Sequence, residues 1–158
     1  MTVLSVIIPV YYNQESLPLL YQRLNLISKK MKDIKISKAT KKDKEQLLTW
    51  FKFYRIEKLI EKRIDCYLEH NYTVIAKDKN IIVGVLQWHV KENAAHGLAE
   101  IEEVLIQENY KGKGIGSSLV LFAIGAIRSY FIEKNIKPRK IFLFVGKGNT
   151  AARKLYEK

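Results

Sequence analysis

The sequence predicts an α/β domain with a mixed, mostly antiparallel sheet flanked by helices, and three observations support this fold class. Residues 72–90 have the pattern of a β-hairpin, because β-branched and aromatic runs stand on either side of a polar KDKN turn. Residues 100–106 and 140–145 have the composition of two further strands, and a long apolar helix is predicted between them. A loop with three glycines, Gly112, Gly114 and Gly116, joins the first of these strands to the helix.

Composition limits the class of protein. The chain has 158 residues, of which 47% are hydrophobic and 28% charged, as in one globular domain. Its net charge of +12 fits nucleic acid, a membrane surface or a small polyanion as partner, and charge alone does not choose among them. The one cysteine, Cys66, excludes an intramolecular disulfide, and the apolar start VLSVIIPV is too short for a membrane span. We therefore expect a cytoplasmic protein without a membrane partner.

The chain divides into an appended strand–helix segment, residues 1–30, and a domain that opens afresh over residues 31–158. The first segment predicts a strand over 4–10 and a helix with leucines at helical spacing over 17–24. The second begins with an alternating strand over 34–39, followed by Thr40 and Asp43, the spacing of a capping box. Over residues 44–70 the apolar positions recur at threes and fours, which predicts one broken or two consecutive amphipathic helices.

The glycine loop NYKGKGIGSSL, residues 109–119, predicts an anion site. Glycines let backbone N–H groups approach a ligand closely, and the start of the following helix supplies unpaired donors. A P-loop needs four residues between its first glycine and a Gly-Lys-Ser/Thr, which is absent. A dinucleotide fingerprint is disfavoured too, because the third glycine comes one residue early.

The loop and its surroundings resemble the GNAT superfamily of N-acetyltransferases. The family signature, Gln/Arg-x-x-Gly-x-Gly/Ala, is matched by KGKGIG with Lys111 at the first position, and GNTAARKLYEK resembles the second family motif. The resemblance covers residues 31–158 and implies that the anion is the pyrophosphate of acetyl-CoA. It also implies that this pyrophosphate is held by the backbone N–H groups of Lys111, Gly112, Lys113, Gly114, Ile115, Gly116 and Ser117.

Further cofactor contacts follow from the same resemblance. The pantetheine arm would pair with backbone groups of Leu105 and Ile106, while Lys111 and Lys113 add positive charge. Asn149 would both cap the last helix and contact the cofactor. The three histidines show no metal-ligand spacing, so no metal is expected.

The implied reaction is direct transfer of an acetyl group to a primary amine. An alkylammonium has a pKa of about 10, so a base must take a proton from it. By resemblance to family members with an acidic pair before the VLI segment, Glu102 is the first choice as base or amine anchor and Glu103 the second. Each glutamate taken singly is equally well explained as a solvated charge. Tyr156 takes the place of the family's general acid, seven residues after Asn149.

The alternation of a β-strand assigns these glutamates to faces of the sheet. It predicts that Glu100 and Glu102 share one face with Val104 and Ile106, and that Glu103 lies on the other.

The two ends of the chain depart from the acetyltransferase pattern. Residues 3–24 resemble the start of a family 2 glycosyltransferase, but the Asp-x-Asp metal motif is absent, so we expect no glycosyl transfer. Family members usually continue past LYEK into a closing strand or two, whereas this chain stops at Lys158. We expect the strand over residues 4–10 to fill the vacant sheet edge, in the same chain or in a neighbour's, the latter making a homodimer.

The acceptor remains open at this point. A protein N-terminus, a lysine side chain, a polyamine and an aminoglycoside all satisfy the chemistry. The alternative from another class is a truncated, non-catalytic module that binds CoA or another protein. Nucleic-acid binding is supported by charge alone, and we do not expect it.

Overall fold

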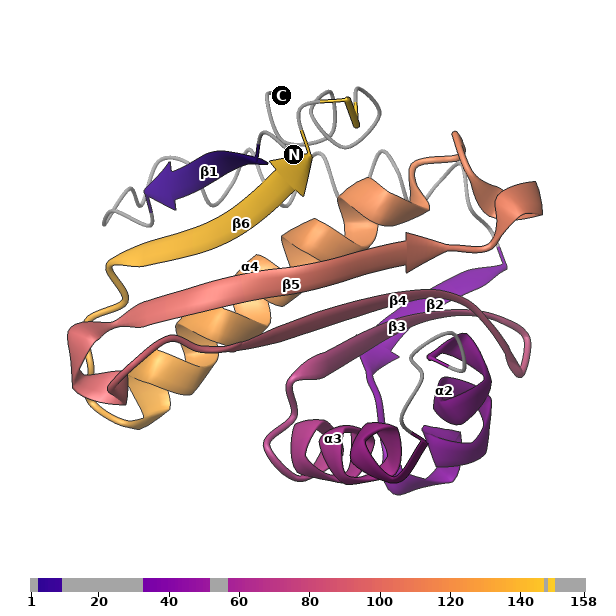
Figure 1. Cartoon of the computed structure of the whole chain (residues 1–158), viewed down its shortest axis with the longest axis horizontal. Helices are drawn as coiled ribbons and strands as arrows, with labels where there is room; N and C mark the ends of the chain where they lie inside the picture. Colours follow the sequence, from indigo (N-terminus) through magenta and orange to yellow (C-terminus); the bar gives the residue numbers. More distant parts are fainter. Residues whose placement is uncertain (1–2, 10–32, 52–56, 147, 150–158) are drawn as a thin grey trace.

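The computed structural model describes residues 3–9, 33–51, 57–146 and 148–149. Six strands form one sheet in the order β1-β6-β5-β4-β3-β2 (Figure 1). Only β5 and β6 run parallel, and every other neighbouring pair is antiparallel. The predicted fold class is therefore confirmed. The strands are β1 (Val3–Pro9), β2 (Ile34–Lys38), β3 (Thr73–Asp78), β4 (Ile81–Val90), β5 (Leu98–Ile106) and β6 (Lys140–Gly146), and the helices are α2 (Lys44–Trp50), α3 (Glu57–Glu69) and α4 (Ile115–Glu133).

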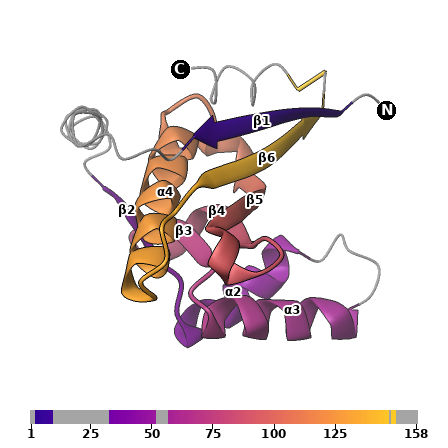
Figure 2. The ribbon, with the colours of Figure 1, turned by 90° about the vertical axis from the view of Figure 1, so that its left-hand side faces the viewer.

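Helix α4 covers one face of the sheet, as Figures 1 and 2 show. By length and composition α4 is apolar enough to cross a membrane. In this fold its buried side chains instead pack against the sheet, at the spacing of one helix face. They include Ile115, Leu119, Ala123, Ile127 and Phe131.

Helices α2 and α3 lie on the opposite face, against β2, β3 and β4 (Figure 2). The sequence predicted one broken or two consecutive helices here, and the structure has α2 and α3, with residues 52–56 between them outside the described residues. The capping box is also present, since Thr40 donates its backbone amide and its hydroxyl to Asp43 Oδ2, at 2.9 and 3.0 Å. The second core cluster includes Leu47, Phe51, Ile60, Ile64 and Leu68 from this helical region.

Strand β1 pairs antiparallel with β6, from Val3 opposite Gly146 to Pro9 opposite Lys140. The predicted edge strand is thus confirmed within the same chain. The helix predicted over residues 17–24 and the final helix after Asn149 lie outside the described residues.

Strands β5 and β6 are paired over four residues only. Their register runs from Leu98 opposite Lys140 to Ile101 opposite Leu143. Both strands continue beyond this point, β5 to Ile106 and β6 to Gly146, so they diverge like the arms of a V (Figure 1). The backbone of β5 after Ile101 therefore has no ladder partner in β6.

Candidate active site

The glycine loop follows the open arm of β5. After Ile106 the Gln107 amide donates to the Val83 carbonyl at 3.0 Å, which fixes where the loop departs from the sheet. Gly112 and Gly114 have φ of +73° and +89°, values that L side chains rarely adopt. Gly114 is the N-cap of α4, and the first bond of the helix runs from the Ser118 amide to the Gly114 carbonyl, at 3.1 Å.

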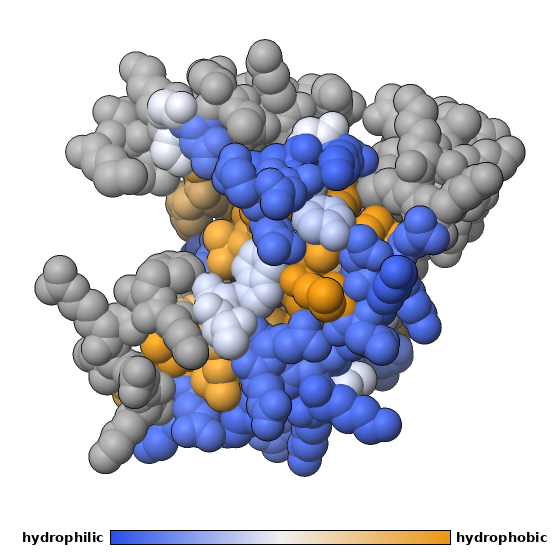
Figure 3. Space-filling view, turned by 90° about the vertical axis from the view of Figure 1, so that its right-hand side faces the viewer, coloured by the Kyte–Doolittle hydropathy of each residue, from blue (hydrophilic) through white to orange (hydrophobic). Residues whose placement is uncertain are grey.

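The amides before that first bond are suited to an anion. Those of Ile115, Gly116 and Ser117 have no partner within the helix, and they stand at its positive end. Apart from the glycine itself and its two chain neighbours, no atom of the described residues lies within 4 Å of the point where a Cβ on Gly112 would be. The structure thus brings the predicted phosphate-binding residues together. Figure 3 faces this end and shows a largely hydrophilic surface around a smaller apolar area.

The two loop lysines are exposed. Lys111 Nζ lies 2.6 Å from Glu108 Oε2, and Lys113 Nζ lies 5.0 Å from the centre of the Tyr110 ring. Asn149 is exposed beyond the end of β6, where its amide donates to the Gly146 carbonyl at 2.8 Å. Leu105 and Ile106, predicted to contact the pantetheine arm, lie on β5 beyond its pairing with β6, with side chains on opposite faces of the sheet.

A β-bulge changes which residues of β5 face α3. Gln87 is opposite Glu103 and Trp88 is opposite Ile101, so Glu102 is an extra residue without a partner in β4. The prediction from simple alternation was therefore wrong: Glu102 and Glu103 both point toward α3, whereas Val104 and Ile106 pack on the α4 side. The bulge places the two candidate bases on one face.

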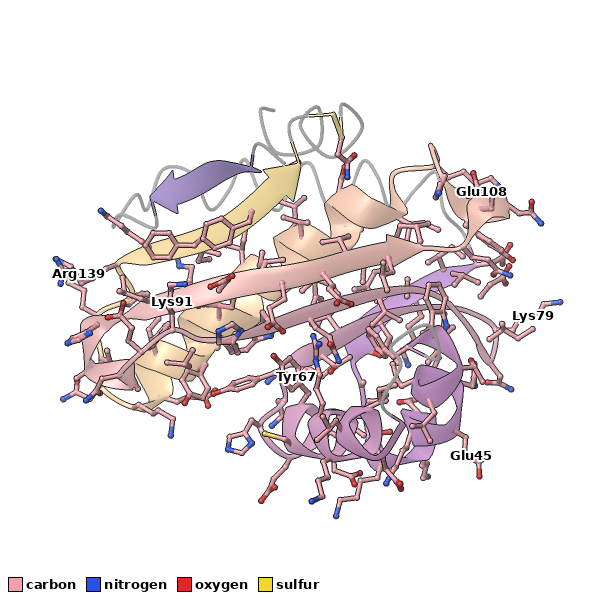
Figure 4. The ribbon with its side chains drawn as sticks, in the orientation of Figure 1. Glu45, Tyr67, Lys79, Lys91, Glu108 and Arg139 are labelled. Carbon is pink, nitrogen blue, oxygen red and sulfur yellow. The ribbon has the colours of Figure 1, made fainter. Side chains whose placement is uncertain are left out.

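Glu102 is held by three side chains. Tyr67 donates its hydroxyl to Glu102 Oε2, and an Arg63 terminal nitrogen donates to the same oxygen at 3.0 Å. His89 Nδ1 lies 3.5 Å from the other oxygen. Burial, followed by the bond to Glu102, raises the pKa of Tyr67 above its ordinary value, so this phenol stays protonated as the donor. Figure 4 shows Tyr67 on α3, facing the sheet.

Arg63 links α3 to both strands of the site. The same terminal nitrogen donates to Gln87 Oε1 at 2.9 Å and lies 3.8 Å from Glu103 Oε1. Its guanidinium also stands over the ring of Tyr67, 5.2 Å from the ring centre. Gln87 is fully buried, so this contact anchors the guanidinium in one place. Arg63 thus holds the carboxylate pair at the point where β5 and β6 begin to diverge.

Glu103 is the more enclosed of the two carboxylates. Its side chain is 18% exposed, compared with 28% for Glu102. Burial raises the pKa of the Glu103 carboxyl, because the charged form loses solvation.

Replacing Glu103 by glutamine is expected to stabilise the fold near neutral pH. Because the folded-state pKa lies above the unfolded one, the ionised carboxyl lowers stability as pH rises through the folded-state pKa. Below the unfolded pKa, about 4.3, the carboxyl is neutral in both states and the gain should disappear. Thermal unfolding of the parent and of Glu103→Gln across this pH range checks the sign. An equal gain at every pH would show that burial of the charge is not the cause.

Sequence reasoning missed the side chains that hold the glutamates. Arg63, Tyr67, Gln87 and His89 come from α3 and β4, and none belongs to a motif. The sequence of α3 did contain a signal for Arg63 and Tyr67. They stand four residues apart, so they share one side of the helix, next to the buried Ile60, Ile64 and Leu68 that face the sheet. Tyr156 lies outside the described residues, so its role as general acid stays a prediction.

Comparison with known proteins gives a family match. Residues 41–158 match the model of the family described as "Acetyltransferase (GNAT) family". A search of curated protein sequences gives no match.

Three similar solved structures illustrate the fold. A GNAT-family acetyltransferase from Streptococcus pneumoniae has a TM-score of 0.64 at 19% identity, covering 78% of this chain and 81% of that one. The NatC complex bound to Gag peptide and CoA gives 0.61 at 18% identity, covering 79% and 82%. An aminoglycoside acetyltransferase from an uncultured soil metagenomic sample gives 0.57 at 23% identity, covering 80% and 86%. At these identities the likeness shows the fold.

Proposed function

Because the chain belongs to the acetyltransferase (GNAT) family, which matches residues 41–158, we propose that it transfers an acetyl group from acetyl-CoA to a primary amine. One observation carries this proposal. The glycine loop with its free helix-start amides stands at the end of β5, directly beside the divergence of β5 and β6. An anionic head group and a linear amide-containing arm can therefore bind side by side.

The residues present fit acetyl-CoA in two parts. The loop from Lys111 to Ser117 would hold the pyrophosphate through backbone amides, assisted by the two lysine charges. The open backbone of Leu105 and Ile106 would pair with the amides of the pantetheine arm. The thioester would then lie near Ile101. Ile101 is the last residue of β5 that pairs with β6, and Glu102 and Glu103 follow it directly.

The chemistry requires one proton acceptor and one proton donor. Glu102 would take a proton from the acceptor ammonium, so that the nitrogen lone pair can attack the thioester carbonyl. Tyr67 and Arg63 would keep this carboxylate in position, since both donate to Glu102 Oε2. The other oxygen, Oε1, lies near His89 Nδ1. Glu103 is the second candidate. Tyr156 would give a proton to the departing thiolate, as the family resemblance implies.

The acceptor is proposed only as a primary amine. The similar structures include an aminoglycoside acetyltransferase and a complex bound to a peptide, so one fold serves different amines. Glu102 and Glu103 lie on the face of the sheet toward α3. An acceptor would approach the thioester from this side.

Titration of acetyl-CoA into the purified chain, followed by calorimetry, tests the site. We expect micromolar binding to the parent and a loss on the order of 100-fold in Gly114→Asp. The new residue would be strained at φ +89°, and its carboxylate would repel the pyrophosphate at the start of α4.

Gly125→Asp is the matched control for this titration. Gly125 lies on the same helix, and no atom stands within 4 Å of its would-be Cβ, so this change adds the same charge away from the loop. Parent-like binding by Gly114→Asp would exclude the loop as the site. If the parent itself binds no acetyl-CoA, the proposal fails and the non-catalytic interaction module becomes the better explanation.

A further inference from the structure

A second carboxylate–amine pair lies on the same face of the sheet as the Glu102 cluster. Lys91 follows β4 directly, and its amide donates to the Leu98 carbonyl at 2.9 Å. Its Nζ lies 2.5 Å from Glu100 Oε2. Since the neighbours of Glu100, Ala99 and Ile101, are buried in the α4 cluster, Glu100 points to the α3 side. The described residues give this pair no part in holding Glu102 or Glu103.

Two aromatic rings complete the surroundings of this amine. Lys91 Nζ lies 5.8 Å from the ring centre of Phe142 and 5.4 Å from that of Phe144, both on β6. The alternate residues Ile141, Leu143 and Val145 are buried against α4, so the two rings also face the α3 side. The ammonium is thus held by a carboxylate and two π-faces. Figure 4 shows Lys91 in front of β5 and β6.

The amine stands where the two strands separate. Leu143 is the last residue of β6 that pairs with β5, and Phe144, which is 50% exposed, is the first beyond it. In the proposed function the thioester lies at this same point. The Lys91 ammonium therefore already occupies the side from which an acceptor amine would attack.

We propose that Lys91 is itself an acceptor, and that the chain acetylates its Nζ with its own bound acetyl-CoA. This inference rests on the proposed function, because it uses the same thioester. An amine held beside the reacting group needs no separate encounter, which favours reaction even when the amine is a modest substrate.

The step balances with Glu100 as the first proton acceptor. The Glu100 carboxylate takes one proton from the Lys91 ammonium and later releases it to solvent. The freed lone pair forms a C–N bond to the acetyl carbonyl carbon, and the C–S bond breaks. The nitrogen loses its second proton as the amide forms, and this proton goes to the thiolate, giving CoA with a free thiol.

The product would alter this part of the surface. Acetyl-lysine is neutral, so the ion pair with Glu100 and the attraction to both rings are lost. Glu100, Phe142 and Phe144 would then be free to receive the ammonium of an external acceptor. One modification per chain would thereby change how the site receives amines.

Peptide mass spectrometry of the full chain after timed incubation with acetyl-CoA tests the proposal. We expect Lys91 to be acetylated at least about tenfold faster than Lys134. Lys134 is the matched control, since its Nζ also lies over a ring, 5.1 Å from the centre of Tyr130, but it caps the far end of α4. The rate at Lys91 should not fall on dilution of the protein, because the reaction is within one chain.

Two variants separate enzymatic from spontaneous acetylation. Glu100→Gln should slow modification of Lys91 and leave that of Lys134 unchanged, with thermal unfolding confirming that the variant is folded. In Gly114→Asp, Lys91 should be acetylated no faster than Lys134. If Lys91 is still acetylated faster than Lys134 in this variant, or if the parent acetylates an added amine while Lys91 stays unmodified, the inference is wrong and the proposed function stands. If the parent binds no acetyl-CoA, both are wrong.

Discussion

Replacing Glu102 by glutamine is expected to lower kcat for acetylation of an amine by about 100- to 10,000-fold, the usual contribution of a positioned base. Glutamine keeps the shape of the side chain and can still accept bonds from Tyr67 and Arg63, so the fold should be retained. It cannot take a proton from the acceptor. Thiol release from acetyl-CoA, measured at saturating amine across pH, checks this effect after calorimetry has shown intact acetyl-CoA binding.

Glu103→Gln is the matched control, because the bulge places both residues on the α3 side and both lie near Arg63. We expect it to lower kcat less than about tenfold. The opposite order, with Glu103→Gln the more damaging change, would assign proton transfer to Glu103, whose raised pKa suits a base. Full activity in both variants would exclude a carboxylate base on β5.

Replacing Gly97 by alanine is expected to destabilise the fold by about 2–4 kcal/mol. Gly97 has φ of +66°, which L side chains rarely adopt. A Cβ there would stand 2.2 Å from the Lys137 carbonyl oxygen, and this clash could be relieved only by a shift of the backbone. The Gly97 carbonyl also accepts the amides of Arg139 and Lys140, at 2.8 and 3.3 Å. These bonds join the start of β5 to the start of β6.

Urea unfolding of Gly97→Ala and of Gly125→Ala measures this difference. Gly125 lies inside α4 with open space around its would-be Cβ, so alanine there should stabilise the fold by about 0.5–1 kcal/mol. Equal stability of the two variants would contradict the strained turn at Gly97. Because the turn sets the β5–β6 pairing, Gly97→Ala should also weaken acetyl-CoA binding, whereas Gly125→Ala should not.

Local patterns were sufficient to predict most of the fold. The capping box at Thr40 and Asp43 acts within four residues, and the hairpin over β3 and β4 follows from strand propensity and its polar turn. The loop from Gly112 to Gly116 was recognisable because positive φ and unpaired amides require particular residues in a fixed order. Such features depend on neighbours in sequence.

The parts of the site that depend on pairing between distant segments could not be predicted. The bulge at Glu102 arises from the register of β4 against β5, and strict alternation wrongly grouped Glu102 with Val104 and Ile106 and put Glu103 on the opposite face. The contacts of Arg63 and Tyr67 with Glu102 join positions 35 to 39 residues apart. Only the packing of α3 against the sheet brings these side chains together.

The pairing of β1 with β6 has a consequence for how the chain folds. The paired residues run from Val3 with Gly146 to Pro9 with Lys140, so these contacts join segments that are far apart in sequence. Contacts of this kind form slowly, because a long loop must close before they contribute. During synthesis, β1 leaves the ribosome before β6 and cannot pair until β6 has emerged. We therefore expect the β1–β6 edge to be acquired last, as a distinct slow step in refolding experiments.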